Sequence, residues 1–287
     1  MMEQARNLKK MMQPPQDSAI RVLTVTSAKG GVGKSSVAVN LAIALSRRGK
    51  RPLIVDTDFG LANIDVMLGV KPKYDLYSVV KDRVDVREAV VSGLYGVQFI
   101  SGGSGVEELL NLGDHDLQRI IRNLMCLDDI ADCIIFDTGA GITENILRLI
   151  CASHETLLVT TPEPTSFMDA YALVKIVGKR DIRPSIQLVV NRAETDREAE
   201  AAMEGFIRIA GKYTGMTIHP LGYILRDDNM VRAVKLQVPL LISYPNSKAA
   251  YNFDRLAASF LQSPVAEAPG MKGFIKRLFG RVGESEA

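Results

Sequence analysis

Tryptophan is absent from this chain of 287 residues, which contains only three cysteines and three histidines. The cysteines, Cys126, Cys133 and Cys151, form no CxxC pair and no even set, so a disulfide framework is excluded. We expect them to be buried thiols in a reducing compartment. The histidines lie far apart in the sequence, and a lone histidine is usually a structural hydrogen-bonding residue. No transition-metal site is therefore expected.

Long apolar runs are also missing. No window of 18 residues is both apolar and uncharged, and the first fifteen residues lack the apolar segment of a secretory signal. We therefore expect a cytoplasmic protein without a transmembrane helix. Charge of one sign is not in excess either, since 35 basic residues stand against 33 acidic ones. This balance supplies no global field of the kind that marks a dedicated DNA-binding protein.

The chain does contain an alternation of expected strands and helices. Hydrophobic residues make up 47% of it, enough for a sizeable core. Apolar runs without polar alternation predict buried strands, and apolar residues at three- and four-residue spacing predict helices between them. The pattern indicates an α/β fold with a doubly wound, mostly parallel sheet and helices on both faces. The expected strands are residues 21–26, 52–56, 97–100, 133–137, 156–160, 186–191 and 218–224. The expected helices are residues 35–48, 116–127, 166–179 and 199–213.

Two segments fall outside this alternation. Residues 1–17 end in QPPQD, which cannot continue a helix, so we expect a tail or a short separate helix. Residues 263–270 (SPVAEAPG) have the composition of a linker, and the basic, apolar segment 271–287 follows them. The expected organisation is a single domain, residues 18–262, with an appendage at each end.

A glycine-rich loop, SAKGGVGKS, joins the first expected strand to the first expected helix. Its three glycines let backbone N–H groups and the helix N-terminus point at phosphate oxygens. Lys34 adds positive charge, and the Ser35 hydroxyl is a ligand for Mg²⁺. The loop therefore predicts a nucleotide site. Its expected contacts are Gly30, Gly31, Val32, Gly33, Lys34, Ser35 and Ser36.

Carboxylates follow two other expected strands. Asp56 and Asp58 come at the end of the second strand, and Asp137 ends the apolar run 133–137, which is the Walker B arrangement. Ligands of open α/β sheets bind at the carboxyl ends of the strands, so these side chains are expected to face the nucleotide. Asp137 is then available to a magnesium-bound water.

The loop departs from the common GxxxxGK[ST] pattern, because Ala28 stands at the first glycine position and a second lysine, Lys29, precedes Gly30. In this, KGGVGKS resembles the deviant Walker A loop of the MinD/ParA superfamily of P-loop NTPases. The resemblance implies a homodimer that sandwiches ATP. Lys29 would reach the phosphates bound by the other subunit and neutralise charge that develops during γ-phosphate transfer.

Further superfamily motifs occur in order. Residues 56–63 (DTDFGLAN) resemble switch I, which implies that Asp56 supports hydrated Mg²⁺ and that Asp58 orients the attacking water. Residues 137–142 (DTGAGI) resemble switch II, although relatives often carry proline where Gly139 stands. The implied catalytic residues are Lys29, Lys34 and Asp58. The implied magnesium ligands are Ser35, Asp56 and Asp137.

Candidate base contacts occur later in the chain. Asn191 ends an expected strand where this superfamily uses an asparagine amide to recognise adenine, and Arg192 follows it. The aspartate of the guanine-reading NKxD pattern is absent, which favours ATP over GTP. Residues 222–227 (GYILRD) resemble the GxIPxD loop beside the base, with Leu225 in place of the proline. Asp227 is therefore a further candidate contact.

Two stretches indicate a subgroup. Residues 163–175 (EPTSFMDAYALVK) resemble the (D/E)EPTSxxDAYALxK stretch of flagellar number regulators of the FlhG/FleN/YlxH type. The segment that starts at Glu3 and ends at Lys10 resembles the DQAxxLR helix with which these proteins stimulate a flagellar GTPase of the signal-recognition-particle class. The resemblance implies partners among flagellar C-ring proteins or a flagellar transcription regulator.

The segment that starts at Met271 and ends at Val282 resembles the C-terminal membrane-targeting helix of MinD-type ATPases. Six apolar residues fall on one arc of a helical wheel and four basic residues fill the rest, which is typical of an interfacial helix. The expectation is reversible, peripheral attachment to an anionic membrane at the inner face of the cell membrane, strengthened by two copies in an ATP dimer. Docking of the apolar arc onto the core is the alternative.

The resemblance implies an ATP hydrolase that is slow and stimulated by partners or membrane. Two other functions remain open from the sequence, namely a ParA-type DNA-positioning ATPase and a scaffold that is locked by nucleotide and hydrolyses little. A nitrogenase-type reductase is excluded, because it needs cluster cysteines beside its switches and none occurs there.

Overall fold

The computed structural model describes residues 20–58, 63–81, 83–103, 123, 125–263 and 270–279. An eight-stranded sheet has the order β3-β4-β2-β5-β1-β6-β7-β8. Every neighbouring pair is parallel except β3 with β4. The strands are β1 (Arg21–Ser27), β2 (Pro52–Thr57), β3 (Val91–Leu94), β4 (Val97–Ile100), β5 (Cys133–Ala140), β6 (Glu155–Thr160), β7 (Ser185–Ala193) and β8 (Ile218–Leu225).

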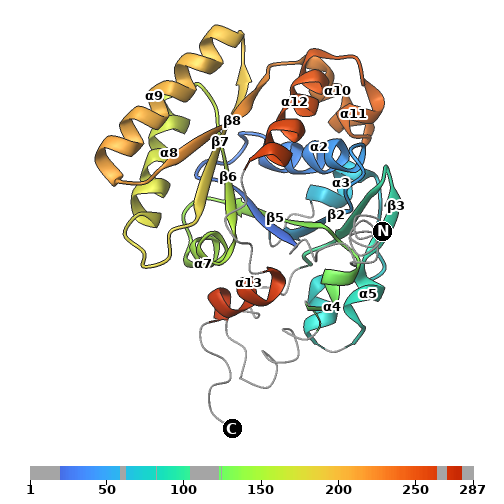
Figure 1. The fold of residues 1–287 in the computed structure, drawn as a ribbon. Helices are drawn as coiled ribbons and strands as arrows, with labels where there is room; N and C mark the ends of the chain where they lie inside the picture. Colours follow the sequence, from blue (N-terminus) through green and yellow to red (C-terminus); the bar gives the residue numbers. More distant parts are fainter. Residues whose placement is uncertain are drawn as a thin grey trace, which may run out of the picture.

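Helices cover both faces of the sheet (Figure 1). Leu23 and Val25 of β1 pack with α2 and α12, whereas Val22, which points to the opposite face, packs with α13. All residues of β2 and β6 are buried, and the middle of each strand is apolar, with polar residues at the strand ends. The described helices are α2 (Lys34–Ser46), α3 (Asn63–Leu68), α4 (Leu76–Val80), α5 (Val86–Ala89), η2 (Cys126–Asp129), α7 (Glu144–Ala152), α8 (Pro164–Val177), α9 (Asp196–Thr214), α10 (Asp228–Leu236), α11 (Leu240–Ser243), α12 (Lys248–Gln262) and α13 (Gly270–Phe279). The doubly wound α/β fold is confirmed.

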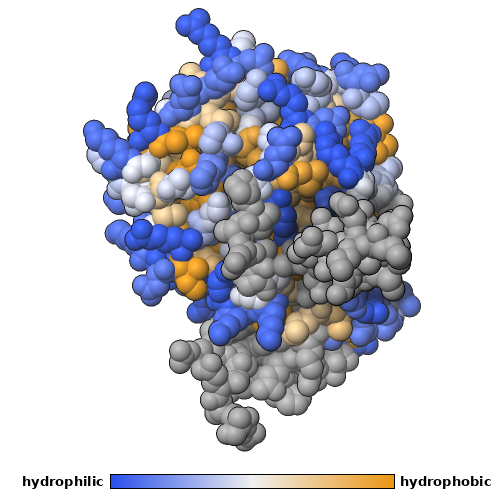
Figure 2. All heavy atoms as spheres, viewed as in Figure 1, coloured by the Kyte–Doolittle hydropathy of each residue, from blue (hydrophilic) through white to orange (hydrophobic). Residues whose placement is uncertain are grey.

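Hydrophilic residues predominate on the face in Figure 2, and the hydrophobic ones form small patches between them. Apolar helix faces are turned toward the sheet instead. In α9, for example, Ala199, Met203, Phe206 and Ala210 are buried at the spacing of one helix face. The polar residues of α9 face outward, which accounts for its amphipathic sequence.

Two features differ from the sequence-based expectations, namely the additional strand β3 and the exposure of two cysteines. Strand β3 pairs antiparallel with β4 at the edge of the sheet, through a turn in which Tyr95 and Gly96 have φ angles of 54° and 75°. Of the expected helix 116–127 the structure describes little more than the start of the 3₁₀ turn η2. Cys126 is exposed and Cys151 is only partly buried, whereas Cys133 is buried as expected. The N-terminal tail 1–17 and residues 264–269 of the linker lie outside the described residues.

Helix α13 lies against the core. Met271 and Phe274 are fully buried, and the Phe274 ring stacks on Phe136 of β5 with centroids 4.8 Å apart. Arg277 Nε donates a hydrogen bond of 2.8 Å to the Ala152 carbonyl at the end of α7. The basic side chain of Lys272 is exposed. Met271, Phe274 and Ile275 of the apolar arc are thus covered by protein in this structure, while Val282 and the side chain of Phe279 lie outside what the structure describes. No helix among the described residues has the length and hydropathy needed to cross a bilayer.

Candidate nucleotide-binding site

The phosphate loop runs from the carboxyl end of β1 to the start of α2. Gly31 and Gly33 have φ angles of 78° and 90°, which side chains other than glycine rarely adopt. Gly33 is the N-cap residue of α2 and, having no side chain, makes no cap hydrogen bond to the first turn. Free N–H groups and the positive end of the helix dipole therefore point out of the loop, as an anion site requires.

Asn191 supports this loop from the end of β7. Its Nδ2 donates a hydrogen bond of 2.7 Å to the Val32 carbonyl, and its Oδ1 accepts one of 3.0 Å from the Arg192 amide. A Cβ atom on Gly33 would lie 2.4 Å from Asn191 Nδ2, so the close approach also requires glycine there. Asn191 therefore stabilises the conformation of the phosphate loop, a structural role that the sequence motif did not predict. Its adenine contact stays a prediction.

Lys34 and Asp137 form a buried ion pair at the centre of the site. Lys34 Nζ lies 2.8 Å from Asp137 Oδ1, and the two side chains are 7% and 0% exposed. Burial raises the pKa of Asp137, and the Lys34 ammonium opposes that rise. Asp137 Oδ2 is also buried and has no hydrogen-bond partner among the described residues. The Lys34 ammonium is therefore available to a phosphate group, and the unpaired Asp137 oxygen is available to a metal ion or to a water bound to it.

Asp56 lies beside Asp137 on the neighbouring strand, since the two residues are register partners of β2 and β5. Asp56 is almost fully buried, and burial together with the Asp137 charge raises its pKa to about 7. Its oxygens accept hydrogen bonds from the amides of Asp58 at 2.9 Å and Ile64 at 3.4 Å. Two adjacent carboxylates in a dry site favour a bound cation.

The donors fit Mg²⁺ in particular. The Ser35 hydroxyl accepts a 3.3 Å hydrogen bond from the Lys34 ammonium, which also donates to Asp137, so the hydroxyl and the carboxylate lie close together. Oxygen ligands from a hydroxyl and carboxylates suit Mg²⁺, which also keeps waters and phosphate oxygens in its shell. Among the residues in the described ranges no three His, Cys, Asp or Glu side chains form a metal cluster, so a nucleotide would have to complete the shell.

Asp58, in the switch I motif, lies beside Gly139 of the switch II motif. Its Oδ2 accepts a 3.0 Å hydrogen bond from Asn63 Nδ2, and its Oδ1 would be 3.1 Å from a Cβ atom on Gly139. A side chain at position 139 would crowd the Asp58 carboxylate, which accounts for the glycine at this position. Residues 59–62 of the switch I motif lie outside the described part of the chain. The carboxylate lies on the Asp137 side of the site, since Asp58 contributes to the raised pKa of Asp137.

Lys29 makes contacts that its motif did not predict. Its Nζ donates hydrogen bonds to Thr165 Oγ1 at 2.8 Å and Glu163 Oε2 at 3.2 Å. Both partners belong to the stretch 163–175, which sequence analysis used only to assign the subgroup. The Lys29 side chain is 38% exposed, and an exposed pair of this kind contributes about 0–1 kcal/mol. Lys29 is therefore held at the surface by contacts that a stronger anion can replace.

A cavity of about 660 Å³ opens beside the loop. It brings together Gly33, Ser36, Asn191, Arg192 and Asp227 from the predicted contacts. Its apolar lining includes Met230, Val231 and Phe253, which sequence analysis missed because no motif marks them. The volume is in the range of small-molecule sites.

Asp227 also has a structural duty. Its Oδ1 accepts from the Asn229 amide and caps α10, and its Oδ2 accepts from the Ala249 amide in α12 at 3.2 Å. Both oxygens are thus engaged with helix starts, and a role in nucleotide binding stays a prediction.

These features define a P-loop nucleotide-binding protein. The glycine loop ends at the start of a helix, its lysine is buried, and two acidic residues lie beside it on adjacent strands. A family model named ParA, described as "NUBPL iron-transfer P-loop NTPase", matches residues 18–261. The chain belongs to the ParA/MinD family of P-loop ATPases.

Similar proteins include two flagellar regulators. The antiactivator FleN of Pseudomonas aeruginosa is 32% identical over 90% of this chain and 93% of its own length. The flagellum site-determining protein YlxH of Helicobacter pylori is 32% identical over 92% of this chain and 91% of its own. Among solved structures, the cell-division ATPase MinD of Pyrococcus furiosus has a TM-score of 0.66 at 28% identity, covering 84% of this chain and 98% of that one.

Proposed function

We propose that this protein is an ATPase that dimerises with ATP, hydrolyses it slowly and regulates the number and placement of flagella. The observation that carries the proposal is the position of Lys29. This second loop lysine is held at the surface by hydrogen bonds to Glu163 and Thr165. In a face-to-face dimer such a lysine can exchange these weak contacts for the phosphates across the interface. The contacts belong to the stretch that resembles flagellar regulators, which supports this subgroup.

The proposed chemistry assigns one task to each side chain. The loop N–H groups and Lys34 bind the β- and γ-phosphates, and Lys34 exchanges its bond to Asp137 for phosphate oxygens. Mg²⁺, when bound through Ser35, Asp56 and Asp137, neutralises phosphate charge. Asp58 orients the attacking water and accepts its proton. Lys29 from the second subunit offsets the charge that develops on the transferred group.

Membrane attachment through α13 would require the helix to leave the core. Phe274 and Met271, which belong to the apolar arc, are buried against the core and would have to become exposed before they could enter a lipid surface. The stacking partner Phe136 immediately precedes Asp137 in β5, so the docking surface is covalently adjacent to the nucleotide site. We propose that ATP-dependent dimerisation releases α13 and that two released helices bind an anionic membrane together.

Vesicle cosedimentation tests this step. We expect protein with ATP and Mg²⁺ to pellet with phosphatidylglycerol vesicles, and protein with ADP to stay largely in the supernatant. Phe136→Leu weakens the stacking without altering the helix, so it should raise pelleting in ADP severalfold. Phe274→Glu should abolish pelleting in either nucleotide. Equal pelleting of full-length protein and a chain ending at residue 263 would refute attachment through α13.

The N-terminal segment is proposed to stimulate a flagellar GTPase of the signal-recognition-particle class. Deleting residues 1–10 should leave ATP hydrolysis unchanged, because the nucleotide site begins with β1, and should abolish GTPase stimulation. The measurement is GTP turnover of that partner with full-length and shortened protein. Equal stimulation by both would refute the assignment. The name of FleN, an antiactivator, further supports a flagellar transcription regulator as a second partner, beside C-ring proteins.

A further inference from the structure

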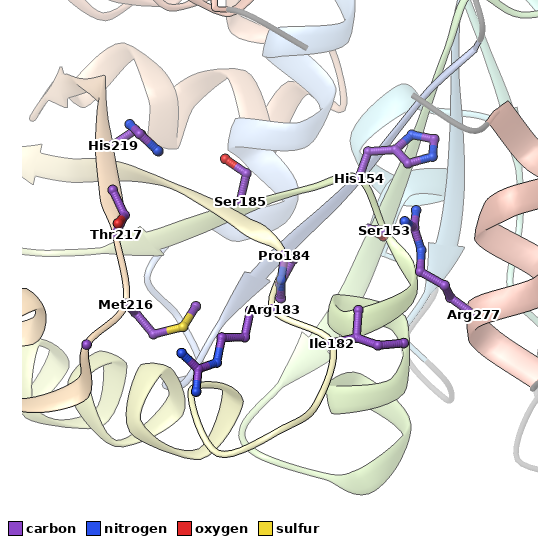
Figure 3. Close-up of a pocket in the computed structure, with 11 residues that line it drawn as sticks. Ser153, His154, Ile182, Arg183, Pro184, Ser185, Met216, Thr217, His219 and Arg277 are labelled. Carbon is purple, nitrogen blue, oxygen red and sulfur yellow. The ribbon is translucent and has the colours of Figure 1, made fainter. Parts of the chain in front are cut away.

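A second cavity, of about 460 Å³, lies at the edge of the sheet opposite the phosphate loop (Figure 3). Ser185 at the amino end of β7 and Thr217 just before β8 form one side of it. His154, which precedes β6, and Arg277, which extends from α13, form the other. The cavity is therefore built jointly by the core and by the docked C-terminal helix.

The lining is basic. Arg183, Arg277, His154 and His219 contribute to it, and none of its lining residues is acidic. Burial, aided by the charges of Arg277 and Arg21, lowers the pKa of His154 to about 4. The imidazole is therefore neutral at pH 7. Burial lowers the pKa of the Arg277 guanidinium from its ordinary value, but the group stays charged. Arg21 itself is paired with Glu155, and so does not supply a free charge to this cavity.

Two buried hydrogen-bond donors on residues that line the cavity have no acceptor among the described residues. His154 Nδ1 accepts a 3.1 Å hydrogen bond from the Val22 amide, so the proton of the neutral ring is on Nε2. That Nε2 is buried and has no partner among the described residues. Arg277 Nη2 is likewise buried without a partner in the described part of the chain, although Nε of the same group is bound to Ala152. Unsatisfied buried donors are rare and call for an acceptor.

We propose that this cavity binds an oxyanion of the phosphate class, held by the Arg277 guanidinium and the His154 Nε2–H, with the exposed Arg183 at its mouth. An anion satisfies both donors and supplies a counter-charge for Arg277, which has no ion-pair partner within the described ranges. The volume exceeds that of inorganic phosphate and accommodates a phosphate ester such as a lipid headgroup. Because Arg277 belongs to α13 and His154 to the core, the anion stabilises the docked helix.

Histidine NMR tests the site directly, because the chain has only three histidines. Full-length protein saturated with Mg²⁺ and ADP is titrated with inorganic phosphate, and His154→Gln and His219→Gln variants assign the ring signals. The expected result is a saturable shift of the His154 signal. Arg277→Gln should weaken the apparent affinity at least tenfold, and Arg183→Gln, at an exposed position, severalfold. Arg208→Gln on α9 is the matched control and should leave the affinity unchanged.

Two further arms complete the test. Short-chain phosphatidylglycerol below its micelle concentration distinguishes a headgroup site, which both compounds fill, from a free-phosphate site, which the lipid leaves empty. At ten times the measured Kd, phosphate should slow amide hydrogen exchange of residues 270–279 about tenfold, because release of α13 then requires the anion to dissociate. A His154 signal that neither compound shifts, equal shifts in wild type and Arg277→Gln, or unchanged exchange of α13 would overturn the proposal.

Discussion

Lys34→Gln is expected to lower the affinity for ATP at least a hundredfold. The ammonium is buried at the base of the phosphate loop, where its charge-assisted hydrogen bonds to phosphate are screened little by water. Two such bonds contribute about 3 kcal/mol or more, and each 1.4 kcal/mol is a tenfold change in affinity. Titration with a fluorescent ATP analogue in the presence of Mg²⁺ measures the loss.

Lys29→Gln is the matched control, since it removes the same charge from the same loop at an exposed position. We expect it to retain ATP affinity and to lose dimerisation and hydrolysis. Lys34→Gln has a second consequence, because Lys34 lowers the pKa of Asp137. Without it that pKa rises further, and the buried carboxyl takes up a proton at higher pH. An undiminished ATP affinity of Lys34→Gln would contradict the role of Lys34 in binding the phosphates.

Asp58→Ala is expected to reduce the rate of ATP hydrolysis by a factor of about 10² to 10⁴, the range typical of a lost general base. Binding should be retained, because the hydrogen bonds of Asp58 in the described part of the chain go to Asp56 and Asn63, so Lys34 and the phosphate loop remain in place. The variant should therefore accumulate as an ATP-bound dimer. Single-turnover hydrolysis, measured beside ATP binding, separates the two effects.

Asn63→Ala provides a graded comparison. It removes the 3.0 Å hydrogen bond that orients Asp58 but leaves the carboxylate in place. We expect a smaller loss of rate than for Asp58→Ala. A wild-type rate for Asp58→Ala would remove this residue from the mechanism.

Local patterns predicted most of the sheet and the phosphate loop. Strand β4 begins and ends at the expected residues, and β1, β2 and β8 differ from expectation by one residue at one end. The buried strands carry apolar runs that the sequence shows directly, and a glycine loop between a strand and a helix has a nearly invariant geometry. Strand β3 was missed because its pairing depends on the Tyr95–Gly96 turn, and a short edge strand has little apolar pattern of its own.

Long-range contacts were beyond sequence reasoning. The bond from Lys29 to Glu163 joins residues 134 positions apart, and neither side chain signals the other. Periodicity identified the amphipathic face of α13 but could not tell lipid from Phe136 as its receiving surface. The duties of Asn191 and Asp227 as loop support and helix cap likewise appear only when distant segments come together.

Sedimentation velocity with Mg²⁺ and either ATP or ADP tests the central claim most directly. The Asp58→Ala variant removes turnover, so its ATP state persists through the run. The proposed switch predicts a dimer with ATP and a monomer with ADP, and a monomer in both nucleotides when Lys29→Gln is added. Identical sedimentation of Asp58→Ala with ATP and with ADP would contradict it.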